Sequence, residues 1–111
     1  MRTLVTLLCL VALPALAQQD HRLGRWPCFY GSDPYGTLSL TQHGYALSEA
    51  PEYSGTGRLT WTGDLFALAD GPLVRSGITD GMVYQPPGRS DLWVVDLYSD
   101  LGVVLECGIR D

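Results

Sequence analysis

Alternating hydrophobic and polar residues run through the second half of the chain, and this pattern predicts β-strands rather than helices. Two such runs, 58–62 and 65–69, flank Gly63-Asp64, a two-residue loop with glycine first, as a type II′ hairpin turn prefers. In this register Trp61 faces Phe66, and the neighbouring leucines 59 and 68 also face each other. One side of the hairpin is therefore apolar and is expected to pack on the core.

A second apolar hairpin is expected at the end of the chain, from residues 92–99 and 103–109. A three-residue loop, Asp100-Leu101-Gly102, with Gly102 in a left-handed bulge position, pairs Ser99 with Val103. A two-residue loop would instead place a carboxylate among the apolar residues of each face, so we favour the longer loop. The favoured register makes three apolar pairs: Leu97 with Leu105, Val95 with Cys107, and Trp93 with Ile109.

The remaining strands are expected at 26–30, 37–41 and 45–47, with weaker ones at 73–75 and 81–85, and residues 31–36 read as a turn-rich loop. With His43-Gly44 as a loop, Leu40 faces Leu47. No segment after residue 17 has sustained helical periodicity. The pattern predicts an all-β protein, a small antiparallel meander of about eight strands that closes as a barrel or a sandwich.

The first residues change the picture of the chain's location. Arg2 precedes an apolar run from 4 to 13, Pro14 breaks it, and Ala15-Leu16-Ala17 is typical of a signal-peptide cleavage site. We therefore expect a signal peptide at 1–17, a flexible lead-in at 18–25 and a single β domain at 26–111. The protein would be periplasmic or secreted, and no stretch is long enough to span a membrane as a helix.

Two cysteines lie beyond the predicted signal peptide, Cys28 and Cys107, and in an exported protein an even count predicts a disulfide. The bond would close a loop of 79 residues, for which chain entropy gives an upper limit of about 4.5 kcal/mol of stabilisation. It would also join the first strand to the last, as closure of a meander requires.

Charge narrows the range of partners. Residues 18–111 hold six basic residues against twelve acidic ones, a net charge of −6, and the chain contains no lysine. Nucleic acids and anionic membranes need clustered positive charge, so we expect neither as a partner. A charged partner, whether a protein or another envelope component, would be basic.

Candidate chemistry is sparse. The favoured register of the last hairpin places Asp96 opposite Glu106 on its outer face. The pair is either a solvated surface pair or a metal-binding or acid/base site with one raised pKa. The aspartates Asp64, Asp70, Asp80 and Asp100 are explained by turn chemistry without a calcium ion. Neither histidine, His21 in the lead-in or His43 at a hairpin tip, is placed to activate a nucleophile. The sequence holds no motif of a known catalytic site and no signal for a cofactor.

Aromatic residues outside the core are candidates for recognition. Tyr98 is expected on the outer face of the last hairpin, where it would form part of a binding patch or be covered by another part of the fold. Four more tyrosines, at 30, 35, 53 and 84, lie at loops or strand ends, where a partner or a saccharide would use them.

The segment Ser54-Gly55-Thr56-Gly57, followed by Trp61, Phe66, Asp70-Gly71-Pro72-Leu73 and a closing Glu106-Cys107, resembles short exported proteins of Gram-negative bacteria whose function is uncharacterised. The same segment, with residues 61–64, also resembles the periplasmic inhibitors of C-type lysozyme, which are small disulfide-stapled β-barrels. That second resemblance implies that Ser54 and Arg58 contact the enzyme. The chain departs from it because the two segments are closer together and the lysine usual near the second is missing.

Together these observations favour an exported, non-enzymatic binding or envelope-associated module without a cofactor. Two alternatives are a periplasmic lysozyme inhibitor and a small metal-binding or hydrolytic protein that uses Asp96 and Glu106.

Overall fold

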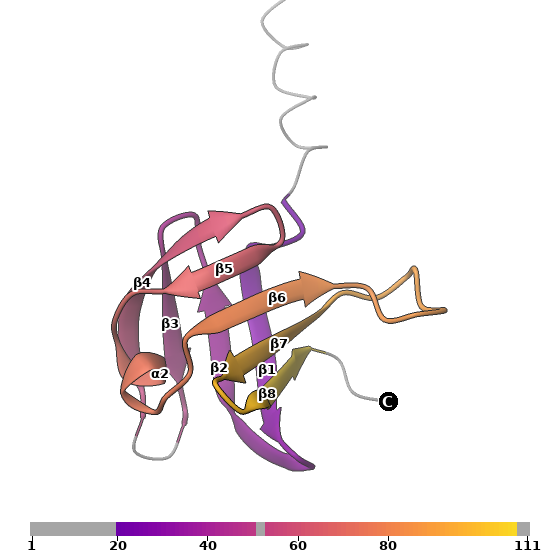
Figure 1. The fold of residues 1–111 in the computed structure, drawn as a ribbon. Coiled ribbons are helices and arrows are strands. Elements are labelled where there is room, and N and C mark those ends of the chain that lie inside the picture. Colours follow the sequence, from indigo (N-terminus) through magenta and orange to yellow (C-terminus); the bar gives the residue numbers. More distant parts are fainter. Residues whose placement is uncertain (1–19, 51–52, 109–111) are drawn as a thin grey trace, which may run out of the picture.

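Eight antiparallel strands form a closed barrel in the computed structural model, which describes residues 20–50 and 53–108 (Figure 1). The strands follow the order of the chain around the barrel, so each pairs with its neighbours in sequence and the last pairs with the first. Their bounds are β1 Gly24–Tyr30, β2 Asp33–Leu40, β3 Gly44–Ser48, β4 Gly55–Thr62, β5 Leu65–Leu68, β6 Asp80–Tyr84, β7 Val94–Ser99 and β8 Gly102–Gly108. The all-β meander is confirmed, and it closes as a barrel.

The barrel interior is filled with side chains. Because successive residues of a strand point to opposite faces, each strand sends alternate apolar residues inward. The fully buried side chains include Leu38, Leu40, Leu47, Val83, Val95, Leu97 and Leu105. Leu73 and Ile78, from the connection between β5 and β6, complete this core. Among the described residues, the interior of the barrel is therefore a packed apolar core.

The barrel is closed covalently as well as by pairing. Cys28 on β1 lies opposite Cys107 on β8, and the two form a disulfide, as predicted. Within residues 20–50 and 53–108, β1 pairs with β8 at Cys28 and Phe29. Pro27, which has no N–H to donate, lies just outside this pairing.

The β4–β5 hairpin has the predicted turn and register. Trp61 pairs with Phe66 and Leu59 with Leu68, around Gly63-Asp64, and Gly63 has a φ of 62°. Trp61 and Phe66 also pack ring against ring, with centroids 4.8 Å apart.

The last hairpin has the predicted core pairs but a different turn. Leu97 pairs with Leu105 and Val95 with Cys107, as expected. The predicted three-residue loop is wrong, because Ser99 pairs with Gly102 across a two-residue turn. A bulge between Leu97 and Tyr98 then shifts the register, so the apolar residues still face inward. The expected pairing of Trp93 with Ile109 lies outside the described residues.

Two predictions for β2 and β3 are corrected. The loop expected at 31–36 is only Gly31-Ser32, since β2 already begins at Asp33. The turn between β2 and β3 is Gln42-His43 rather than His43-Gly44, because Thr41 closes on Gly44 through its backbone N–H and its hydroxyl. Leu40 therefore pairs with Tyr45 and not with Leu47. The register differs from the expected one by two residues, an even number, so the same side chains still point into the barrel.

The weak strand expected at 73–75 is instead a short helix, α2 Pro72–Arg75. Proline suits the first turn of a helix because it lacks the N–H that would have no partner there. The preceding Gly71 has a φ of 95° and supplies no side-chain cap. Tyr45 of β3 caps the helix instead. Its hydroxyl accepts the Leu73 N–H at 3.0 Å and donates to the Asp70 carbonyl at 2.8 Å.

No helix among the described residues is long and apolar enough to cross a membrane.

Candidate functional site

The predicted carboxylate pair is formed, but its two members differ in exposure. Asp96 of β7 pairs with Glu106 of β8 on the outer face of the barrel. Glu106 is exposed, whereas Asp96 is only 8% exposed. Tyr84, at the end of β6, donates its hydroxyl to Asp96 Oδ2 at 3.0 Å. Asp96 is thus a buried, hydrogen-bonded carboxylate, not half of a solvated surface pair.

Burial sets the electrostatics of this pair. Loss of solvent raises the pKa of Asp96, the Glu106 charge raises it further, and hydrogen bonds from Tyr84 and Tyr98 act in the opposite direction. Burial and the neighbouring Asp96 raise the pKa of Tyr84 to about 12, so its hydroxyl stays a hydrogen-bond donor at neutral pH.

The pair lines an open cleft of about 250 Å³, together with Tyr84, Pro86 and Val94. Among the described residues, no group of three or more histidines, cysteines or carboxylates is placed to hold a metal ion. The cleft therefore offers two carboxylates and a phenol beside an apolar wall, which suits hydrogen bonding more than metal coordination. Tyr98 lines a different cleft, between β5 and β6, with Phe66, Asp80 and Gly81.

Ser54 and Arg58 lie at opposite ends of one segment and serve different purposes. The Ser54 hydroxyl accepts the Ala50 N–H and donates to the Ala50 carbonyl, both at 3.2 Å, and so closes the loop between β3 and β4. Arg58 donates its backbone N–H and its Nε to the two oxygens of Asp70, at 2.7 and 2.8 Å. The Arg58 side chain remains 78% exposed. Of the two, Arg58 is the one presented to solvent.

Three of the four tyrosines singled out from the sequence gather at one cleft of about 280 Å³. Tyr30, Tyr35 and Tyr53 line it, above a floor that includes Ile78 and Leu105. These tyrosines come from β1, β2 and the loop before β4, which meet at the lower end of the barrel in Figure 1. The fourth, Tyr84, belongs to the Asp96 cleft.

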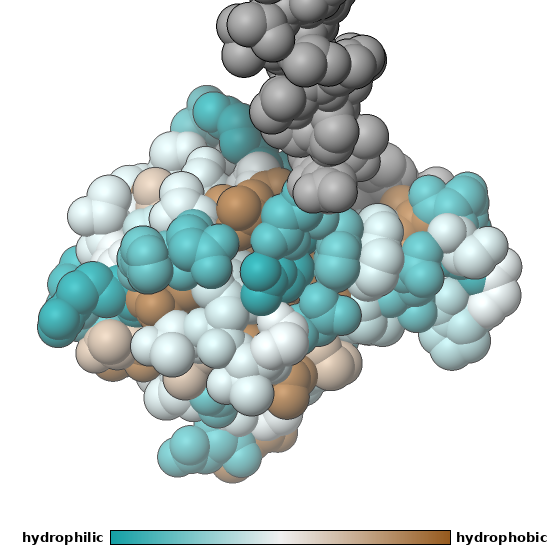
Figure 2. Space-filling model, turned by 90° about the horizontal axis from the view of Figure 1, so that it is seen from above, coloured by the Kyte–Doolittle hydropathy of each residue, from teal (hydrophilic) through white to brown (hydrophobic). Residues whose placement is uncertain are grey.

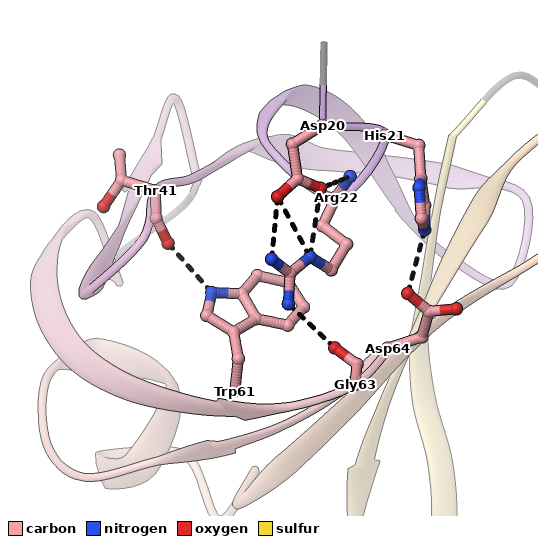
Figure 3. Close-up of polar contacts among 7 residues, drawn as sticks. All are labelled: Asp20, His21, Arg22, Thr41, Trp61, Gly63 and Asp64. Carbon is pink, nitrogen blue, oxygen red and sulfur yellow. Dashed lines mark hydrogen bonds and ion pairs between the residues drawn. The ribbon is translucent and has the colours of Figure 1, made fainter. Parts of the chain in front are cut away.

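A polar network lies at the other end of the barrel, where residues 20–23, here called the N-terminal strap, cross the β4–β5 turn (Figure 3). Arg22 forms an ion pair with Asp20 at 2.7 Å and donates Nη1 to the Gly63 carbonyl at 2.9 Å. Its guanidinium lies 4.7 Å from the centre of the Trp61 ring, a cation–π contact. The hydrogen bonds from Arg22 lower the pKa of Asp20 to about 2.

His21 makes the second half of this network. Its ring stacks on Trp93 with centroids 3.9 Å apart and an angle of 20° between the planes. Its Nε2 lies 2.8 Å from Asp64 Oδ1. The Trp61 indole N–H is used elsewhere, since it donates to the Thr41 carbonyl at 3.0 Å.

The sequence pattern predicts no role for residues 20–23, which belong to the expected flexible lead-in. The contacts of Arg22 and His21 reach residues about forty to seventy positions away, and no periodicity connects segments so distant. The one available signal was local: Asp20 and Arg22 carry opposite charges two residues apart.

Comparison of the chain with known proteins finds no matching family model, no matching curated protein and no matching solved structure.

Proposed function

We propose that the protein is an exported, non-enzymatic binding module, periplasmic or secreted, that engages a basic protein or another envelope component through its outer surface. One observation carries this proposal: the barrel interior is packed with apolar side chains, and the clefts lined by Asp96 and by the tyrosines are open to the surface. Barrels of this size that enclose a ligand need an interior left open for it. Recognition by this protein is therefore a property of its surface.

The negative net charge of the protein favours a basic partner. Residues 18–111 carry a net charge of −6, and such a surface attracts basic proteins over long distances at low ionic strength. The first experiment measures binding of the oxidised protein to a basic C-type lysozyme and to an acidic protein of similar size, at two salt concentrations. Salt-sensitive binding of the basic protein alone supports the proposal. Equal binding of both proteins, or of neither, refutes it.

A second candidate, inhibition of C-type lysozyme, is favoured by the exposure of Arg58. A cation presented on β4 suits an enzyme that works with a pair of carboxylates in its cleft. The fold is also of the kind that the resemblance implies, a small β-barrel stapled by a disulfide. Under this candidate the segment from Ser54 to Arg58 would approach the enzyme.

The test is inhibition of a C-type lysozyme by the oxidised protein, by Arg58→Gln and by Arg25→Gln. Arg25, an exposed arginine on β1, is the matched control for loss of one positive charge. Inhibition that Arg58→Gln abolishes and Arg25→Gln preserves supports this candidate. A folded, oxidised protein that does not inhibit removes it and leaves the broader proposal in place. Ser54→Ala is less informative, because it also opens the Ala50 loop.

A further inference from the structure

The N-terminal strap occupies a surface that is built to receive a cation. On the barrel side its contacts are the Trp61 ring, the Gly63 carbonyl, the Asp64 carboxylate and the Trp93 ring, here called the aromatic rim. Each of these is a hydrogen-bond acceptor or an electron-rich ring face. The strap supplies the complement, an arginine and a histidine. The rim thus presents acceptors and ring faces of the kind that bind cationic side chains.

Side chains alone attach the strap to the rim. Within described residues 20–23, the one backbone bond outside the strands is from the Leu23 N–H to the Asp20 carbonyl, inside the strap itself. The His21 contact is open to water, since the side chains of His21 and Asp64 are 38% and 46% exposed, whereas the Arg22 side chain is 19% exposed. Contacts of this kind are individually weak, and segments held by few of them open locally.

The surroundings of the rim favour a charged partner over an apolar one. Figure 2 looks down on this end of the molecule; where it is not covered by grey, hydrophilic and near-neutral residues surround separate hydrophobic patches. The rim also belongs to a chain with an excess of acidic residues. A basic segment of another protein would find here the groups that Arg22 and His21 already use.

We propose that the aromatic rim is a recognition site for a pair of neighbouring basic residues on a flexible segment of a partner protein, and that the N-terminal strap is its internal competitor. The inference rests on the proposed function for the nature of the partner, and it adds the place and the chemistry of contact. The partner binds when the strap lifts, so its apparent affinity falls with the fraction of molecules in which the rim is open.

The test uses the exported, oxidised protein and two blocked tripeptides. Acetyl-His-Arg-Leu-amide carries the strap's own sequence, and acetyl-His-Gln-Leu-amide is its uncharged control. Binding is followed by tryptophan fluorescence and by the NMR signals of the Trp61 and Trp93 indole N–H groups. The proteins compared are the wild type, Arg22→Ala, Arg22→Ala with Asp64→Asn, and the surface control Arg25→Ala.

Loss of the strap's arginine opens the rim, so Arg22→Ala is expected to bind the arginine peptide roughly tenfold more tightly than the wild type does. Arg25→Ala is expected to match the wild type. The glutamine peptide should bind several-fold more weakly than the arginine peptide, and adding Asp64→Asn should weaken binding of the arginine peptide. His21→Ala lifts the other half of the strap and provides a second route to the same result.

Equal affinity of the wild type, Arg22→Ala and His21→Ala for the arginine peptide overturns the inference, as does equal binding of the two peptides. Exchange of straps between two copies, seen as a dimer whose formation Arg22→Ala abolishes, also overturns it. The lysozyme measurement keeps the two proposals separate. Binding of lysozyme that Arg22→Ala does not change, with no competition by the peptide, refutes the rim as the site and leaves the proposed function standing.

Discussion

The hydroxyl of Tyr45 joins three parts of the fold, and its removal tests how the short helix is held. Tyr45 is 3% exposed, and its hydroxyl binds both the Asp70 carbonyl and the Leu73 N–H. The change Tyr45→Phe removes these two hydrogen bonds and keeps the ring. The ring packs on Gly57 and the hydroxyl on Gly71, so closely that a Cβ at either glycine would overlap with Tyr45.

The expected cost follows from the two partners left behind. A hydrogen bond contributes about 1 kcal/mol net, and a buried N–H without an acceptor costs about 1–3 kcal/mol. The Leu73 side chain is buried, and its N–H lies in the first turn of α2, where the Gly71 cap offers no other side chain. We expect Tyr45→Phe to lower the free energy of unfolding by about 2 kcal/mol, which for a domain of this size lowers Tm by about 10 °C.

Thermal and urea unfolding measure this loss, and hydrogen exchange at the Leu73 amide locates it. The matched control is Tyr30→Phe, at a side chain that is 61% exposed, for which we expect a change within about 0.5 kcal/mol. A Tyr45→Phe protein as stable as the control, with an equally protected Leu73 amide, would refute the assignment of the hydroxyl as the cap of α2.

Three further predictions concern other parts of the barrel. Replacement of Cys28 and Cys107 by serine should lower the free energy of unfolding by up to about 4.5 kcal/mol, measured in urea against the oxidised protein; an unchanged midpoint would contradict the closure argument. Asp96→Asn should be more stable than the wild type at neutral pH, because the wild type then carries a buried charge whose folded-state pKa is raised. That advantage should shrink as the pH falls through the Asp96 pKa, where the wild-type carboxyl becomes neutral too; urea midpoints between about pH 3 and 8 that show a constant difference would refute it. Gly81→Ala places a methyl group against the Phe66 ring, and we expect overpacking to cost about 1–3 kcal/mol in thermal unfolding, whereas an equally stable variant would show that the ring moves freely.

The sequence predicted the core of the last hairpin better than its turn. The alternating pattern places Leu97 and Leu105 on one face for any turn between the two strands, because burial of the apolar residues fixes the register. The turn was inferred on the assumption that the ladder is regular. The structure has the shorter turn and restores the register with a bulge at Leu97 and Tyr98. A bulge adds one residue without a compositional signal, so pattern alone does not place it.

Features that follow from the local pattern were predictable, whereas those that depend on distant residues were not; this holds for the helix and for the carboxylate pair. A four-residue segment such as Pro72–Arg75 is too short to show a helical period, and its helix depends on Tyr45, which is far away in the chain. The pairing of Asp96 with Glu106 was predictable because it follows from a register. Its burial was not, since it depends on Tyr84 from another strand. The contacts of the strap likewise join segments that only the closed barrel brings together.

The position of the disulfide has a mechanical consequence. Cys28 and Cys107 lie on the first and last strands, 79 positions apart, so the chain from one to the other forms a covalent ring. Tension applied through the chain before Cys28 and after Cys107 passes directly across the sulfur–sulfur bond. The hydrogen-bonded ladders of β2 to β7 carry none of that load, and the barrel cannot be unzipped strand by strand from its ends. Once oxidised, the domain therefore resists unfolding by tension applied between its two ends.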